Sequence, residues 1–212
     1  MTTSVPLACT CGSIRGLATN ATPKGGCRLV CMCDDCQCFA HWLERADEVL
    51  DANGGTEVFQ MTPAQVEITA GAEHIRCVRL SPKGLMRWYA GCCRTPIANS
   101  LASPRFPFVG VFHLFMDHAA DGRSRDEVLG PIRARVHGRF GIGELPADAH
   151  PRAPIGIIFR SLRLLGGGWI RRAHRPTPLF DLDTGKPVSE PTVVSKEERQ
   201  QLLARCGPTP AA

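Results

Sequence analysis

The sequence lacks an export signal and any hydrophobic run long enough to cross a membrane. Its first twenty residues contain no basic stretch followed by an apolar one, which is the pattern of a secretory signal. No segment approaches the roughly 18 uninterrupted apolar residues of a transmembrane helix. We therefore expect a soluble protein of the cytoplasm.

Internal repeats, low-complexity tracts and a strong excess of charge of one sign are also missing. The net charge of +5 comes entirely from residues after position 100. A dedicated nucleic-acid-binding domain carries a much denser basic stripe, so composition does not favour nucleic acid as a partner. Hydrophobic residues make up 43% of the 212 residues, which is enough for a packed core. We expect one domain, or one domain with an appendage.

Cysteine, in contrast, is abundant, with 11 residues. The odd number, the lack of an export signal and the close spacing argue against a disulfide framework. Eight cysteines fall in three clusters, at positions 9 and 11, 31 to 38, and 92 and 93. We interpret the clusters as metal ligands. The others, which we expect to be ordinary apolar or surface residues, are Cys27, Cys77 and Cys206.

Short segments that alternate apolar and polar residues dominate the first hundred positions. This alternation is typical of half-buried strands in an antiparallel sheet. Turn residues such as Asn53-Gly54-Gly55 separate the segments. The predicted strands are 28–31, 57–61, 66–69, 74–80, 85–89 and 97–100. The fold class is therefore predicted to be mainly β.

The second half of the chain differs in composition and holds twelve of the 17 prolines. We predict a zinc-binding β domain over residues 1–105 and a basic, Pro- and Arg-rich extension with short helices over 106–212. Helices are predicted at 34–50, capped by Asp34 or Asp35, and at 125–137, where Pro131 would limit or start the helix. A third is predicted after Ser195, which forms a capping-box pattern with Glu198.

Two cysteines separated by one or two residues in a tight turn can bind the same metal ion. Structural zinc has four ligands in a tetrahedron, and thiolate sulfurs about 2.3 Å away are common ligands. Each short motif supplies part of a site, so several clusters in one small domain indicate zinc more strongly than one. The predicted ligands are Cys9, Cys11, Cys31, Cys33, Cys36, Cys92 and Cys93.

Three motifs also match a known family in order and spacing. They are Cys9-Thr-Cys11-Gly12, Cys31-Met-Cys33-Asp-Asp-Cys36 and Arg87-Trp-Tyr89-Ala-Gly-Cys-Cys93-Arg-Thr95-Pro96. Over residues 7–100 the chain resembles the glutathione-dependent formaldehyde-activating enzymes and the related centromere protein V proteins. The resemblance implies an Mss4-like antiparallel β domain stabilised by zinc.

In that family one zinc ion is structural. Transferred by position, its ligands here would be Cys9, Cys11 and Cys93. The family has a further cysteine ligand in the last motif, and Ala90 occupies its position here. Cys92 is the substitute ligand in this sequence. Whether two adjacent cysteines reach one ion is a question of geometry, and water or another side chain is the alternative fourth ligand.

The resemblance implies a second zinc ion, held by Cys31, Cys33 and Cys36 with one position open. Catalytic zinc uses such an arrangement of three protein ligands. The open position would bind a small thiol such as glutathione, lower its pKa and hold it near an aldehyde. The implied activity is that of a carbon–sulfur lyase. Cys38 is not part of the family pattern and could close the open position.

Three neighbours of these cysteines differ from the family pattern. Met32 replaces histidine, Gln37 replaces arginine or lysine, and Arg94 replaces glycine. We expect all three to touch the ligand pocket. The substrate that the resemblance implies depends on these neighbours, whereas zinc binding depends on the thiolates alone. The isolated histidines that we expect to be structural are His41, His74, His113 and His137.

The segment 150–180 carries six arginines and no acidic residue. Apolar residues recur at helical spacing on the opposite side, although Gly166-Gly167-Gly168 interrupts them. A solvated helix packed on the β domain is the favoured interpretation, and a surface for anionic lipid, nucleic acid or protein is the alternative. The second hypothesis for function is therefore a non-catalytic, zinc-stabilised binding module. The apolar residues are Ile158, Leu162, Leu165 and Trp169.

Overall fold

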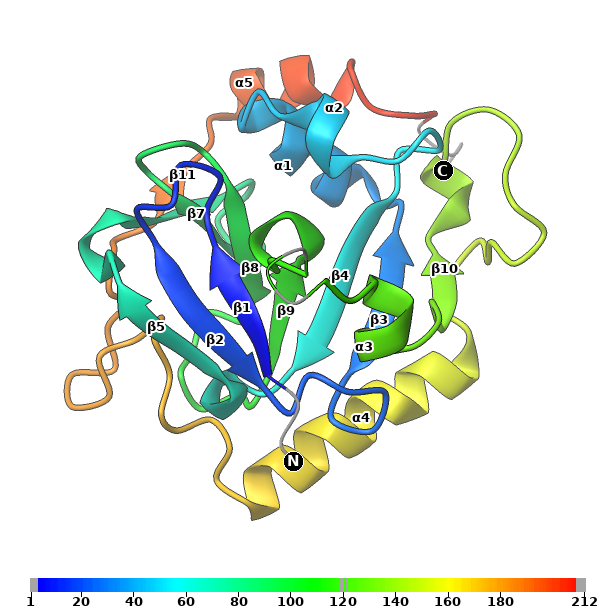
Figure 1. The fold of residues 1–212 in the computed structure, drawn as a ribbon. Helices are drawn as coiled ribbons and strands as arrows, with labels where there is room; N and C mark the ends of the chain where they lie inside the picture. The colour runs from blue at the N-terminus through cyan, green and yellow to red at the C-terminus, as the bar shows by residue number, and fades with distance from the viewer. Residues whose placement is uncertain (1–3, 119, 121, 209–212) are drawn as a thin grey trace.

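Two β-sheets with helices around them make up the computed structural model, which describes residues 4–118, 120 and 122–208 (Figure 1). The smaller sheet has the strand order β1-β2-β5, and the larger has the order β10-β3-β4-β9-β8-β7-β6-β11. The smaller sheet comprises β1 (Ser4–Ala8), β2 (Arg15–Thr19) and β5 (Val66–Ala70). The larger comprises β3 (Cys27–Cys31), β4 (Thr56–Met61), β6 (Ile75–Arg79), β7 (Met86–Ala90), β8 (Pro96–Ser100), β9 (Val109–Phe112), β10 (Ala134–Val136) and β11 (Thr192–Val193). The mainly β fold class is confirmed.

All six segments predicted as strands form strands, β3 to β8. The sequence did not predict β9 to β11, nor β1 and β2, which contain Pro6 and Gly16. Gly16 is required where β2 meets β5, because a Cβ atom there would lie 2.1 Å from the backbone oxygen of Glu67. These two strands depend on their neighbours more than on their own residues.

The inner strands of the larger sheet are antiparallel, as expected, but its two edges are not. β10 pairs in parallel with β3, and β11 pairs in parallel with β6. Parallel partners need long connections, and both edge strands come from the second half of the chain. The predicted division at residue 105 stays a prediction, and in this structure segments from both sides of it share one sheet.

Five α-helices flank the sheets among the described residues. They are α1 (Asp34–Trp42), α2 (Ala46–Val49), α3 (Arg125–Leu129), α4 (Ile155–Ile170) and α5 (Lys196–Leu203). Short 3-10 turns span Pro63–Gln65, Ala72–His74, His113–Phe115 and Gly138–Phe140. None of the helices in the described part of the chain has the length and apolar character needed to span a bilayer.

Three helix predictions need correction. The segment 34–50 is two helices, because the chain turns between them with Glu44 at φ 56°. The N-cap of α1 is Cys33 instead of Asp34 or Asp35. The helix predicted over 125–137 ends at Leu129, before Gly130 and Pro131. The N-cap Ser195 of α5 is confirmed, since its hydroxyl accepts a hydrogen bond from the Glu198 N–H.

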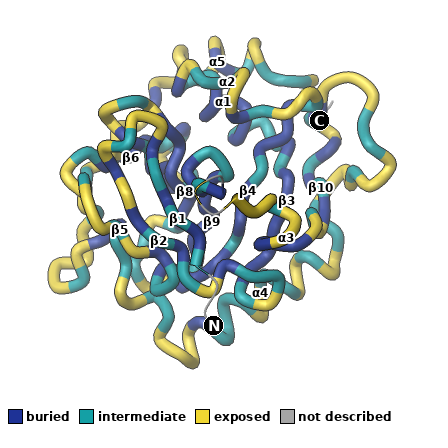
Figure 2. Tube along the Cα trace, in the orientation of Figure 1, coloured by how far each residue is buried: buried dark blue, intermediate teal, exposed yellow. Residues whose placement is uncertain are grey.

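The core has two parts, and the larger sheet contributes to both. One lies against the smaller sheet, and the other beneath α1 and α5. Figure 2 shows that central strands such as β8 and β9 are buried, whereas many connecting loops and parts of β5 are exposed. Large side chains of the first part include Leu7, Ile14, Phe59, Trp88 and Phe115. Those of the second include Phe39, Leu43, Phe112 and Leu202.

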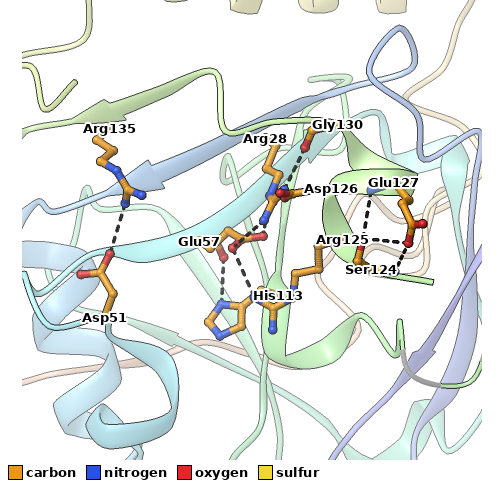
Figure 3. A network of polar contacts seen from close by, with 10 residues as sticks. All are labelled: Arg28, Asp51, Glu57, His113, Ser124, Arg125, Asp126, Glu127, Gly130 and Arg135. Carbon is orange, nitrogen blue, oxygen red and sulfur yellow. Dashed lines mark hydrogen bonds and ion pairs between the residues drawn. The ribbon is translucent and has the colours of Figure 1, made fainter. Parts of the chain in front are cut away.

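A buried ion-pair network fastens α3 to the larger sheet (Figure 3). Arg28 on β3 donates to Glu57 on β4 at 2.8 Å and also pairs with Asp126 on α3. Arg125 reaches the same glutamate at 3.2 Å. Burial alone would raise the pKa of Glu57, but the Arg28 hydrogen bond and charge hold it below its ordinary value. The network therefore stabilises the contact between α3 and the sheet.

Candidate metal centres

Four cysteines from two hairpin loops form the first group. The β1–β2 loop supplies Cys9 and Cys11, and the β7–β8 loop supplies Cys92 and Cys93. All four Sγ atoms lie within 4.8 Å of one another. Cys11 lies 3.5 Å from Cys9 and 3.4 Å from Cys92, and the Cys9–Cys92 and Cys92–Cys93 distances are 3.9 and 3.8 Å.

These distances fit a single tetrahedral zinc ion. A zinc–sulfur bond of about 2.3 Å places the sulfurs of a tetrahedron about 3.8 Å apart. The structure also answers the question of the adjacent cysteines, because both Cys92 and Cys93 reach the group. Ala90 is fully buried and is the last residue of β7, two positions before Cys92. The four cysteines could therefore hold a metal ion without a further ligand.

Hydrogen bonds hold the two loops together. Thr95 accepts from the Thr10 N–H at 3.0 Å, and its hydroxyl lies 3.1 Å from the Cys93 sulfur. The Ile14 N–H donates to the Cys9 sulfur at 3.2 Å. Arg94 has a φ of 57°, a left-handed conformation that favours glycine. Arginine adopts it at the position where the family has glycine.

The electrostatics of the first group favour a negative charge at Cys93. Burial opposes ionisation, but hydrogen bonds from Thr95 and Thr10 lower the pKa of Cys93 to about 5. Burial and the neighbouring Cys11 sulfur raise the pKa of Cys92 to about 12. Four close thiols cannot all ionise without a cation, since like charges repel. A bound metal ion removes that conflict.

The second group lies where β3 ends and α1 begins. Cys31 is the last residue of β3, Cys33 is the N-cap of α1, and Cys36 is in its first turn. Their three Sγ atoms lie within 4.8 Å of one another, and the first two are 3.4 Å apart. The amino end of a helix favours negative charge, so this place suits thiolates. The group offers three ligands to a metal ion.

A buried arginine accompanies the second group. Arg87 on β7 is only 1% exposed, and its Nη1 lies 4.0 Å from the Cys36 sulfur. Its Nη2 lies 3.8 Å from Asp35, and it donates to Asn99 at 3.3 Å. Hydrogen bonds from Cys31 and Cys33, together with the charge of Arg87, hold the pKa of Cys36 well below its ordinary value. A buried cation of this kind needs negative partners, and thiolates supply them.

A cavity of about 390 Å3 opens on the second group. α4 forms one wall, and strands of the larger sheet form the other. Half of the lining side chains are apolar, namely Leu29, Val58, Leu85, Phe108, Val136, Ala153, Ile157, Ile158 and Leu162. The polar lining residues besides the cysteines are Asp35, Gln60, Arg87, Asn99, His137 and Ser161. The three sulfurs therefore face a space that a small molecule can enter.

Cys38 does not belong to the second group. Cys38 is fully buried, and its sulfur lies 3.3 Å from the sulfur of Cys206, a residue that follows α5. Cys38 comes two residues after Cys36 on α1, so its side chain points about 200° around the helix from it. The expectation that Cys38 could close the open position is not met in this arrangement.

The three departures from the family pattern lie away from the cavity, contrary to expectation. Met32 is buried beside Gly141, and Arg94 pairs with Glu44 at 2.9 Å. Gln37 donates to the backbone oxygens of Met32 and Phe140 and accepts from the Gly207 N–H. None of the three is among the residues that line the cavity. Gln37 instead ties α1 to two later segments of the chain.

Sequence reasoning missed the polar residues that surround the second group. Arg87 was noted only as the first residue of the third motif, Asn99 was an unremarked position in a predicted strand, and His137 was expected to be structural. In the structure His137 lines the cavity, and its buried Nδ1 has no hydrogen-bond partner among the described residues. Burial lowers the pKa of His137, which favours the neutral ring. No spacing pattern links these residues to the cysteines, because only the sheet brings them together.

Comparisons with known proteins place the chain in a family without giving it an activity. Residues 1–192 match the group described as Family of unknown function (DUF6151), and the chain belongs to this family. A search of curated proteins finds no match.

Proposed function

We propose that this member of the DUF6151 family binds two zinc ions, one structural and one that receives a small thiol, and acts as a carbon–sulfur lyase on a thiol–aldehyde adduct. One observation carries the proposal. Three cysteine sulfurs converge to within 4.8 Å at the wall of a cavity of about 390 Å3, beside a buried arginine. A metal ion with three protein ligands keeps a position for an exogenous one.

The structural role goes to the group of Cys9, Cys11, Cys92 and Cys93. Four sulfurs satisfy tetrahedral zinc and leave no position for substrate. The group joins two hairpins, one from each sheet, so the ion would cross-link the sheets at that end. Its proposed contribution is to folding.

The reactive role goes to the group of Cys31, Cys33 and Cys36. Zinc bound there would supply a Lewis acid that lowers the pKa of an incoming thiol. Arg87 supplies a fixed positive charge that balances the excess negative charge of three thiolates on a divalent ion. His137, neutral and with a free ring nitrogen, could take the proton that the entering thiol loses.

The lining of the cavity favours a small thiol with an apolar carbon skeleton. Arg87 is the one arginine or lysine among the described lining residues, and it already pairs with Asp35 and the Cys36 sulfur. Glutathione carries two carboxylates, so it would need cations that this lining does not offer. The resemblance to glutathione-dependent enzymes supports the class of reaction, and we propose an Mss4-like fold on the same basis.

Metal analysis combined with calorimetry tests this proposal. The wild-type chain should bind two zinc ions, and a small aliphatic thiol should bind to it more tightly than glutathione does. Cys33→Ser should lose one zinc ion and all thiol binding. Cys206→Ser should keep two zinc ions and the thiol binding. If the chain binds two zinc ions but no thiol, the proposed lyase activity is excluded. The alternative, a zinc-stabilised binding module, would then stand.

A further inference from the structure

The outer face of α4 is apolar, which is unusual for a surface helix. Ile155, Phe159 and Ile170 are 69%, 61% and 86% exposed. Leu162 and Trp169 are exposed on the same face, and the Trp169 ring packs against Phe106. α4 runs along the edge of the molecule opposite α1 and α5 (Figure 1). Exposed apolar side chains in one row mark a surface that binds something.

Polar contacts fix the helix in this orientation. Arg160 donates to the backbone oxygens of Pro23 and Gly26, and Ser161 donates to Gln60 at 3.2 Å. At Gly168 a Cβ atom would lie 2.6 Å from Pro107, so only glycine permits this approach. The helix therefore continues through all three glycines, although the sequence suggested an interruption there, and Gly168 lets it lie against Pro107. Its apolar side faces outward as a result.

A basic groove runs beside the same helix. It has a volume of about 980 Å3 and no acidic residue among its described lining residues. Its cationic lining residues are Lys24, Arg133, Arg160, Arg163 and Arg171. Exposed arginines continue beyond both ends of α4, at Arg152, Arg172 and Arg175. None of the exposed arginines from 152 to 175 forms an ion pair with a described residue.

We propose that α4 and the basic groove dock on an anionic lipid membrane. The apolar side chains would enter the interface between headgroups and acyl chains, and the groove would take lipid phosphates. Nucleic acid fits less well, because Ile155, Phe159 and Ile170 would lie against phosphates. A symmetric dimer through α4 would bring the arginines of two copies together, which like-charge repulsion opposes.

The docking surface and the cysteine cavity share a wall. Ile158 and Leu162 are exposed on α4 and also line the cavity. A membrane bound at α4 therefore touches the rim of that cavity. The inference does not depend on the proposed thiol chemistry, since it rests on the helix and the groove alone.

Vesicle binding tests the docking. Full-length, zinc-loaded protein should cosediment with phosphatidylcholine vesicles that contain about one third phosphatidylserine, and not with pure phosphatidylcholine. Trp169 provides a second signal, because Trp88 is buried and Trp42 is only half-exposed. Its fluorescence should shift to the blue on binding, and Trp169→Phe should abolish the shift.

Two pairs of variants separate this surface from general effects. Phe159→Ser and the double change Arg163→Gln with Arg172→Gln should each weaken vesicle binding, the latter about 25-fold, since each surface arginine contributes about fivefold. The matched controls are Val188→Ser and Arg205→Gln. Val188 is 47% exposed and lies outside α4, and Arg205 follows α5 on the side of the molecule opposite α4. Both controls should bind like the wild type, and inorganic phosphate should not replace the vesicles in shifting the Trp169 fluorescence.

Three results would overturn the proposal. They are wild-type protein that does not bind anionic vesicles, equal losses in the α4 variants and the controls, or a concentration-dependent dimer that Phe159→Ser abolishes. The last would assign the surface to a second copy of the chain. Zinc content, measured on each variant, shows that the protein remains folded independently of its thiol binding.

Discussion

The two cysteine groups of this chain differ in ligand number and in surroundings. The first has four sulfurs at the tips of two hairpins, and Cys11 and Cys92 are exposed. The second has three sulfurs at a strand–helix junction that faces a cavity. The difference teaches that similar short cysteine motifs can suit different roles. A fourth cysteine completes a site suited to folding, whereas an open fourth position leaves a site suited to chemistry.

The groups also differ in how their negative charge is balanced. In the first, hydroxyl and backbone N–H groups contact the sulfurs, as at Thr95 and Ile14. In the second, the fixed charge of Arg87 lies beside Cys36. Neutral donors suit a site in contact with water, whereas a buried site needs a counter-charge.

The largest effect should follow from breaking the first group. Cys11→Ser should lose one zinc ion and lower the melting temperature by about 10 °C or more, because structural zinc contributes directly to folding. Cys33→Ser should lose one zinc ion with a smaller change in melting temperature. Metal analysis and thermal denaturation check both, with Cys206→Ser as the control. A greater loss of stability in Cys33→Ser would reverse the assignment of roles.

Removing the counter-charge should affect only the second group. Arg87→Met leaves the Cys36 sulfur without its buried cation, whereas Asp35 keeps its pair with Arg199 at 2.7 Å. The change should cost about 3 kcal/mol of stability. It should also weaken the second zinc ion while the first is retained. Competition with a chromogenic chelator measures this, and Arg76→Met, on the exposed face of β6, is the control. Loss of both ions together would show that the groups are not independent.

A change outside both groups should alter stability but not zinc content. Glu57→Gln removes the more buried of the two carboxylates that pair with Arg28 and should cost about 3 kcal/mol at pH 7. The folded pKa of Glu57 is below the unfolded value of about 4.3, so its stabilisation is present above that pH. The stabilisation is lost as the pH falls through the lower folded pKa, where wild type and variant should converge. Urea denaturation at several pH values checks this, and the exposed Glu197→Gln should show no such gap.

A smaller effect is expected from the hydroxyl that supports the first group. Thr95→Val removes the hydrogen bonds to Cys93 and Thr10, which should cost about 1 to 2 kcal/mol. The first zinc ion should dissociate faster while the second is unchanged. Zinc release to a chelator over time gives the two rates. Thr95→Ser should restore the wild-type rate, and its failure to do so would contradict the role of the hydroxyl.

The smallest effect on metal content should follow from Cys38→Ala. Because its sulfur faces Cys206 instead of the second group, zinc should stay at two ions per chain with thiol binding intact. Calorimetry with the same thiol as for the wild type checks this. A tighter thiol complex in Cys38→Ala would show that Cys38 does occupy the open position in solution.

The sequence predicted the local features of this protein. Alternation of apolar and polar residues predicted β3 to β8, and Ser195 predicted the start of α5, because both depend on near neighbours. The spacing of the cysteines predicted both groups, which the structure brings together. Strands such as β1 and β2 were not predicted, since pairing with neighbouring strands stabilises them.

Only the tertiary structure decided the surroundings of the cysteines. Arg87 and His137 lie 51 and 101 positions after Cys36 in the sequence. Both nevertheless line the same cavity as Cys36. The orientation of Cys38 toward Cys206 depends on where α5 packs against α1. Ligand spacing is a local property of the chain, whereas burial, counter-charge and the shape of a cavity depend on contacts between distant segments. The sequence by itself therefore determined where metal could bind, and the fold determined which group is open.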